Sequence, residues 1–170
     1  MTGHTPDNLD ADEVMIRPAE EEDHEVIREM FRKSMAEGQL RGNDTGADIE
    51  NLREGYFADD GASGFWVASR HGEIIGMIGV QKTRENTAEL RRLYVRVGYR
   101  RQHVGTMLIE HAIDFCRQKG YLKVILDVRL ERSPAIAILQ KFGFTHVRTR
   151  EIDGYKRLDF YLDLYREPKG

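Results

Sequence analysis

The stretch AELRRLYVRVGYRRQHVGTMLIEHAIDFCRQKG, residues 88–120, decides the architecture of the chain. Alternation over 88–95 predicts a strand, and apolar residues at helical spacing from Val104 onward predict a helix that ends at Gly120. An arginine-rich turn joins the two. Strict alternation divides the strand into two faces of mixed polarity, Leu90, Arg92 and Tyr94 on one and Glu89, Arg91, Leu93 and Val95 on the other.

The arginine-rich turn predicts an anion site. The first backbone N–H groups of a helix have no partner inside it and lie at the positive end of its dipole. Gly105 would let a ligand approach this backbone closely, and Arg100 and Arg101 add charge just before it. Segment 82–104 holds seven basic and two acidic residues, a net +5, within a chain of formal net charge -3. A pyrophosphate group fits such a site; the alternative is a solvated arginine-rich face.

Patterns elsewhere complete the order β-α-α-β-β-β-α-β-α-β-β, which predicts one mixed sheet with helices on both faces. The predicted elements are a strand at 14–18, a helix over 20–37, a weaker helix that begins at Asp48 and ends near Asp59-Asp60-Gly61, a hairpin turning at His71-Gly72, a strand at 124–128 covered on both faces, a helix capped by Ser133 with Pro134 in its first position, and a last hairpin turning at Asp153-Gly154.

Composition limits the class of protein. A chain of 170 residues with 40% hydrophobic and 32% charged residues suits one globular domain, here 14–166, after an acidic tail at 1–13 that we expect to be disordered. The single cysteine, Cys116, and the scattered histidines predict no metal site, and a lone thiol suits the cytoplasm. The first residues contain no signal or membrane-spanning pattern. Negative net charge argues against nucleic acid as a partner.

Three motifs together resemble the GCN5-related N-acetyltransferase (GNAT) family. They are LYV at 93–95, GYRRQHVGTMLI at 98–109 and AIAILQKFGF at 135–144. The resemblance covers nearly the whole chain, from Val14 to Leu164, and implies the acyl-CoA N-acyltransferase fold. That fold is a mixed, mostly antiparallel sheet of six to seven strands in which a bulge splays two central strands, here 88–95 and about 123–128. Acetyl-CoA is the implied cofactor.

The resemblance also implies where the coenzyme binds. Pantetheine and the acetyl group would contact the strand at Leu93 and Val95, with Tyr94 between them. The backbone from Gln102 to Thr106 would surround the pyrophosphate, and the flanking arginines would reach phosphate oxygens. The implied coenzyme contacts are therefore Leu93, Tyr94, Val95, Arg100, Arg101, Gln102, His103, Val104, Gly105, Thr106, Arg132 and Leu139.

Three of these positions depart from the family pattern. His103 stands where glycine is usual, and we expect it in the right-handed region, where a side chain adds no strain. Arg132 stands where an asparagine usually contacts pantetheine. Leu139 replaces the tyrosine that commonly protonates the departing thiolate, so we assign the general acid to Tyr155 on the late hairpin.

Glu89 is the predicted general base. Direct attack on a thioester needs a neutral amine, so a carboxylate must accept the amine proton, directly or through water. Glu89 lies on the predicted strand six residues before Val95, where several family members carry a catalytic glutamate. The alternative is a structural ion pair between Glu89 and Arg91 or Lys82. No acyl-enzyme nucleophile is expected, because Cys116 is interpreted as an apolar filler.

The predicted function is acetyl transfer from acetyl-CoA to a primary amine in a ternary complex. The amine would lie where the first two helices and the 151–157 hairpin meet the thioester. Acids near that place could favour a cationic substrate: Glu37, Asp44, Asp48 and Glu50. Alternatives are a catalytically weak acyl-CoA-binding or regulatory module and a transferase for peptide or protein N-termini or lysines. Dimers are common in the family, so a homodimer is possible.

Overall fold

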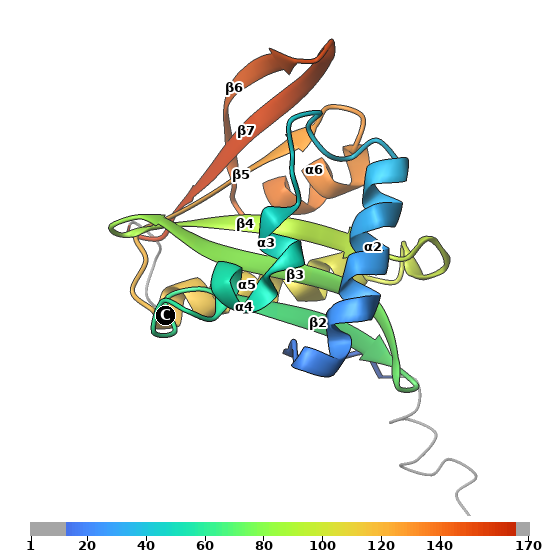
Figure 1. The fold of residues 1–170 in the computed structure, drawn as a ribbon. Helices are drawn as coiled ribbons and strands as arrows, with labels where there is room; N and C mark the ends of the chain where they lie inside the picture. The colour runs from blue at the N-terminus through green and yellow to red at the C-terminus, as the bar shows by residue number, and fades with distance from the viewer. Residues whose placement is uncertain (1–12, 166–170) are drawn as a thin grey trace, which may run out of the picture.

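A computed structural model describes residues 13–165 and shows a single seven-stranded sheet in the order β1-β2-β3-β4-β5-β7-β6 (Figure 1). This confirms the predicted mixed sheet. The tail predicted at 1–13 lies outside the described residues except for Glu13. The strands are β1 (Met15–Pro18), β2 (Gly64–Arg70), β3 (Glu73–Arg84), β4 (Thr87–Val95), β5 (Lys123–Arg129), β6 (Thr145–Ile152) and β7 (Tyr155–Asp163).

Helices cover both faces of the sheet, as predicted. On one face lie η1 (Glu21–Asp23), α2 (His24–Ala36), α3 (Ala47–Glu50) and α4 (Leu52–Tyr56) (Figure 1). The other face carries α5 (Val104–Gln118) and α6 (Ser133–Lys141), with η2 (Val97–Tyr99) leading into α5. The predicted weak helix is two short ones, because Asn51 has non-helical dihedrals and its side chain caps α4 by accepting from the N–H of Glu54.

The centre of the sheet is splayed, as the family resemblance implied. All neighbouring strands are antiparallel except β4 and β5, which run parallel and pair only between Thr87–Glu89 and Lys123–Ile125. Beyond Glu89 the ladder stops, although β4 continues to Val95 and β5 to Arg129. The two strands therefore diverge, and the edge of β4 beyond Glu89 has no hydrogen-bonding partner on β5.

A bulge in β4 reverses the predicted faces of its second half. Gly79 pairs with Arg91 and Met77 with Tyr94, so one residue of β3 opposes two of β4, and Arg92 has a left-handed φ of 62°. The strict alternation predicted for 88–95 is therefore wrong after Arg91, because an inserted residue moves every later side chain to the opposite face. The apolar side chains of β4 consequently lie on the face of the sheet that α5 covers. Its polar side chains and Tyr94 lie on the face that α2 covers.

Two smaller predictions also change. The strand β5 is covered fully on one face only: Val124, Leu126 and Val128 are buried, but Ile125 and Asp127 are partly exposed. The residue that precedes α6 is Arg132, so Ser133 is the first helical residue instead of its cap.

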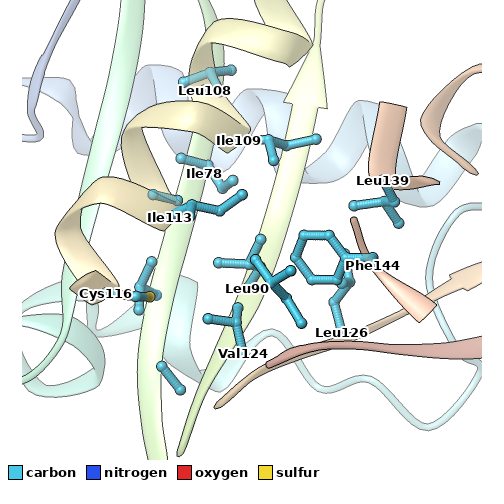
Figure 2. Packing of buried hydrophobic residues seen from close by; sticks show 14 of the residues in the cluster. Ile78, Leu90, Leu108, Ile109, Ile113, Cys116, Val124, Leu126, Leu139 and Phe144 are labelled. Carbon is cyan, nitrogen blue, oxygen red and sulfur yellow. The ribbon is translucent and has the colours of Figure 1, made fainter. Parts of the chain in front are cut away.

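The larger hydrophobic core lies between the sheet and α5 and α6. Figure 2 shows Leu90, Leu126 and Phe144 meeting beneath α5 in this core. Cys116 is fully buried there, as expected for a filler, and burial raises the pKa of its thiol to about 12. A second core packs α2, α3 and α4 against the opposite face of the sheet.

Candidate functional site

A cavity of about 590 Å³ lies at the splay of β4 and β5. Its walls come from β4, the outer half of β5, and the segment between α2 and α3. Residues far apart in the sequence therefore line one cavity. Its charged lining residues are Arg41, Asp44, Asp48, Glu89, Arg91, Arg92, Asp127, Arg132 and Arg157.

The N-terminus of α5 has the geometry of an anion site. The first hydrogen bond of the helix runs from the N–H of Met107 to the carbonyl of His103, so the preceding amides at 104–106 have no acceptor within the helix. A Cβ built on Gly105 would have neighbours only at 3.8 Å, so the backbone surface there is open. Gly105 and Thr106 are partly exposed, so their amides are available to a phosphate group, whereas Val104 is 1% exposed.

The conformation of His103 corrects the prediction. His103 has φ 67° and ψ 11°, a left-handed conformation, where the right-handed one was expected. Arg101 is also left-handed, with φ 69°. Each such residue costs roughly 1 kcal/mol or more. The turn needs this shape because the chain must reverse from η2 into α5, and a histidine here takes up the conformation that glycine adopts without strain.

Arg100 is held by the protein instead of extending freely. Its Nε donates to the carbonyl of Val95 at 2.7 Å, and its Nη2 donates to Glu37 at 2.7 Å. The hydroxyl of Tyr94 donates to the other oxygen of Glu37, also at 2.7 Å. Burial, this carboxylate and its hydrogen bond raise the pKa of Tyr94 to about 12. Gln102, also predicted to contact the pyrophosphate, accepts a hydrogen bond from Arg70 at 2.7 Å.

Leu93 and Val95 lie where the coenzyme was predicted to contact β4. Both are partly buried against the α5 side of the sheet, and β5 offers their backbone no ladder partner. The methyl Cγ2 of Val95 is 3.8 Å from the Cβ position at Gly105, so the strand leads directly to the helix N-terminus.

Arg92 forms a buried ion-pair cluster at the bulge. Its guanidinium donates to Asp44 at 2.5 and 2.9 Å and to Asp48 at 2.5 and 3.0 Å, and its side chain is 4% exposed. Tyr56 donates to Asp48 at 2.5 Å. Burial alone would raise the pKa of both carboxyls, but the hydrogen bonds from Arg92 hold them below the ordinary value of 3.8.

The acids that were expected to favour a cationic substrate are therefore occupied. Asp44 and Asp48 share the single guanidinium of Arg92, Glu37 pairs with Arg100, and Glu50 lies 3.6 Å from Arg28. Each of these acids thus has a basic partner within the fold, which weakens the case for a cation preference.

Glu89 lies in the cavity wall and is free of the structural pairs considered for it. In the described part of the chain it forms no hydrogen bond or ion pair, and Arg91 donates to Gln81 at 2.8 Å instead. Burial raises the pKa of Glu89 above its ordinary value of 4.5, with the charge of Asp127 adding to the effect and that of Arg91 opposing it. A buried carboxyl with a raised pKa is a suitable proton acceptor.

The other assigned residues are placed differently. Tyr155 is about half exposed and lines an adjoining cavity of about 430 Å³, where the guanidinium of Arg129 stacks 3.9 Å from its ring. Leu139 is 1% exposed and lies beside Phe144 in the core (Figure 2). Neither reaches the cavity wall that holds Glu89.

Sequence reasoning missed a cluster around Asp127 on β5. Asp127 accepts from Arg41 at 2.8 Å and from Arg157 at 2.5 Å, and Arg150 is 3.7 Å away. Arg157 also donates to the carbonyl of Gln39. The cluster joins the α2–α3 segment and β7 to the far wall of the cavity. An aspartate within the apolar run 124–128 was the available signal.

Residues 13–165 contain no group of three or more His, Cys, Asp or Glu arranged to hold a metal ion. Over the same residues, no helix combines the length and apolar character needed to cross a membrane.

Comparisons with known proteins agree with the geometry. A model of the acetyltransferase (GNAT) family matches residues 25–144. Human N-acetyltransferase 8 is 32% identical over 102 residues, 57% of this chain and 44% of that protein. The N-acetylaspartate synthetase of Danio rerio is 30% identical over 106 residues, 62% of this chain and 36% of that protein. The chain thus spans less than half the length of these two relatives.

Solved structures share the fold. A protein of Salmonella typhimurium, described as an acetyltransferase and solved with its cofactor acetyl-CoA, superposes with a TM-score of 0.78 at 18% identity. The match covers 92% of this chain and 96% of that one.

Proposed function

We propose that this chain, which belongs to the acetyltransferase (GNAT) family, transfers an acetyl group from acetyl-CoA to a primary amine. The observation that carries the proposal is that the second half of β4 joins three features: its unpaired edge, the open start of α5 next to Val95, and the cavity that holds Glu89. The names of the curated relatives, which specify N-acetyl chemistry, support it.

The residues present fit two parts of coenzyme A, the pyrophosphate and the pantetheine arm. The amides at 104–106 and the exposed Arg101 would hold the pyrophosphate, because they combine fixed dipoles with a mobile charge. Leu93 and Val95 would offer backbone groups and apolar surface to the pantetheine arm along the splay. When bound, acetyl-CoA supplies the acetyl group as a thioester.

Glu89 would accept the proton of the amine. Its carboxylate lies in the cavity wall without a structural partner among the described residues, and its raised pKa makes it a stronger base than an exposed glutamate. The proton passes directly or through one water. Protonation of the leaving thiolate stays assigned to Tyr155, although its side chain would have to leave the ring contact with Arg129 to do so.

Two experiments test the proposal. Calorimetry should show acetyl-CoA binding, and free thiol should appear in the presence of a primary amine panel. Binding with no thiol release on any amine would favour the acyl-CoA-binding module. Reaction of peptides with no reaction of small amines would favour a peptide or protein acetyltransferase.

Substitution of Gly105 tests the phosphate-binding loop. Gly105→Glu places bulk and negative charge at the open amides and should abolish acetyl-CoA binding. Gly105→Ala is the matched control for folding, since a Cβ there meets only ordinary contacts at 3.8 Å. Both variants should unfold in one cooperative transition. Unchanged affinity of the glutamate variant would contradict the loop assignment.

The compartment and the assembly are further proposals. The single buried cysteine supports a reducing, cytoplasmic environment. A homodimer stays a prediction from the family resemblance, and size-exclusion chromatography with light scattering would test it.

A further inference from the structure

The charges on the cavity wall do not cancel. Three of its acids are engaged: Asp44 and Asp48 by Arg92, and Asp127 by two arginines at once, Arg41 and Arg157. The two aspartates on Arg92 leave one negative charge beside the α2–α3 segment, and the two arginines on Asp127 leave one positive charge at β5. The wall therefore has an excess of positive charge beside β5 and the start of α6.

Arg132 adds to this excess. It lines the cavity just before α6. Its backbone is hydrogen-bonded to Arg129 and Ile136, but its side chain forms no hydrogen bond or ion pair within residues 13–165. Burial, together with the positive charges of Arg100 and Arg157, lowers the pKa of Arg132 to about 10. The acid whose charge acts favourably on Arg132, Glu37, is already held by Tyr94 and Arg100. This partly exposed guanidinium has no acid of its own among the described residues and is placed to bind an anion that enters the cavity.

The charged groups of coenzyme A are not expected to be the partner of Arg132. The family resemblance implied a coenzyme contact for Arg132, and Arg100 lies near enough for its charge to act on Arg132. Residues 100–106 are nevertheless absent from the lining of the cavity, whereas Arg132 lies in that lining with Asp127 and Arg157. The part of the coenzyme that would enter the splay is the pantetheine arm, which carries amides and a hydroxyl but no charge. An arginine at this place is thus left for the second substrate.

From this arrangement we propose that the amine substrate carries a carboxylate, and that Arg132 binds it. The inference rests on the proposed acetyl transfer and names its substrate class: amino acids and related amines with a carboxylate at one end and a primary amine at the other. Glu89 serves the amine end and Arg132 the anionic end of the same cavity. Arg132 fixes orientation as a binding residue, since it is placed to contact the carboxylate and not the reacting atoms.

Matched amine pairs test the inference directly. The protein is assayed for acetyl transfer to leucine against leucinamide, and to gamma-aminobutyrate against butylamine. The carboxylate also changes the pKa of the amine, so kcat/KM is compared per unprotonated amine. We expect kcat/KM to favour at least one of the acids by about 10- to 100-fold, the range of a charge-assisted hydrogen-bonded pair. The two pairs also differ in the distance between amine and carboxylate.

Substitution of Arg132 links the preference to this residue. Arg132→Met should bring the ratio of each pair close to one, mainly through KM for the acid, and Arg132→Lys should keep part of the preference. Acetyl-CoA affinity should stay unchanged in both variants. Arg53→Met, at an exposed position on α4, is the control and should leave the ratios unchanged.

Three outcomes would overturn the inference. Equal kcat/KM within every pair would show that the protein does not recognise the carboxylate. A preference for the acid that persists in Arg132→Met would show that Arg132 does not bind the carboxylate. Loss of acetyl-CoA affinity in Arg132→Met assigns the guanidinium to the coenzyme. Absence of transfer to all amines, with acetyl-CoA bound, overturns the proposed function itself and is distinguishable from these three.

Discussion

Arg92 and Arg132 line the same cavity, but within residues 13–165 only Arg92 has acidic partners. Arg92, at the bulge of β4, donates to two aspartates through four hydrogen bonds, and its pKa is raised. The side chain of Arg132, at the start of α6, has no hydrogen-bonding or ion-pairing partner in the described chain, and its pKa is lowered. One arginine is fully satisfied within the fold, and the other is charged and unpaired.

The contrast separates structural from functional charge. A satisfied cluster such as that of Arg92 fixes the α2–α3 segment against β4 and holds a backbone conformation that is unfavourable for a residue with a side chain. An unsatisfied buried charge lowers stability, so its presence needs a different reason. Arg132 and Glu89 are the two groups of this kind that we assign to the cavity.

The largest expected effect comes from removing the satisfied arginine. Arg92→Met leaves Asp44 and Asp48 buried without a cation, and breaking a buried pair on one side typically costs roughly 3 to 5 kcal/mol. Urea unfolding followed by circular dichroism measures the change, with Arg53→Met as the control. A loss below about 1 kcal/mol, the range of an exposed pair, would show that the cluster is not a structural clamp.

Glu89→Gln should have the next largest effect, on turnover instead of stability. Loss of a general base typically lowers the rate by about 100-fold or more. The wild-type rate should fall as pH drops through the raised pKa of Glu89, above 4.5, and this acidic limb should be absent in the variant. Glu85→Gln, an exposed acid in the β3–β4 turn, is the control. An identical pH profile in wild type and variant would remove Glu89 from the mechanism.

The pH dependence of stability should change sign between wild type and Arg92→Met. In wild type the folded pKa of Asp44 and Asp48 is depressed, so their contribution is complete above 3.8 and is lost as pH falls through the folded pKa. Without Arg92, burial raises both folded pKa values, so the variant should gain stability as pH falls from 7 toward 5. The gain is at most about 1.4 kcal/mol per pH unit for each carboxyl that takes up a proton. Urea midpoints at several pH values decide this.

The two arginines also show how far the sequence could be read. The strand-turn-helix pattern of 88–120 was sufficient for the fold, because period-2 and period-3.6 patterns depend on local residue order. The bulge was not predictable in this way: whether Leu93 lies on the α2 face or the α5 face of the sheet depends on the partner strand, which is one residue shorter than β4 over this stretch. A mixed pattern on both faces of the predicted strand was the sign of it.

The site was predictable only in part for the same reason. Glu89 and Gly105 follow from motif position, whereas the pairing of Asp44 and Asp48 with Arg92 joins residues 48 and 44 positions apart in sequence. The left-handed turn at His103 depends on how η2 meets α5, which the residue type does not reveal. Acids in a loop thus looked available, and only their tertiary partners show that they are not.

The smallest expected effect is also the one of opposite sign. Arg132→Met removes a partly buried charge that has no side-chain partner among the described residues, and the lowered pKa of Arg132 means that the folded state accommodates the charged form less well than water does. The variant should therefore be as stable as wild type or more stable, by on the order of 1 kcal/mol, while Arg92→Met is much less stable. Urea unfolding of both in the same buffer measures the difference. Stability gained by removing a group that the reaction uses is the usual trade-off at functional sites. A destabilisation of Arg132→Met close to that of Arg92→Met would mean that Arg132 has a structural role after all.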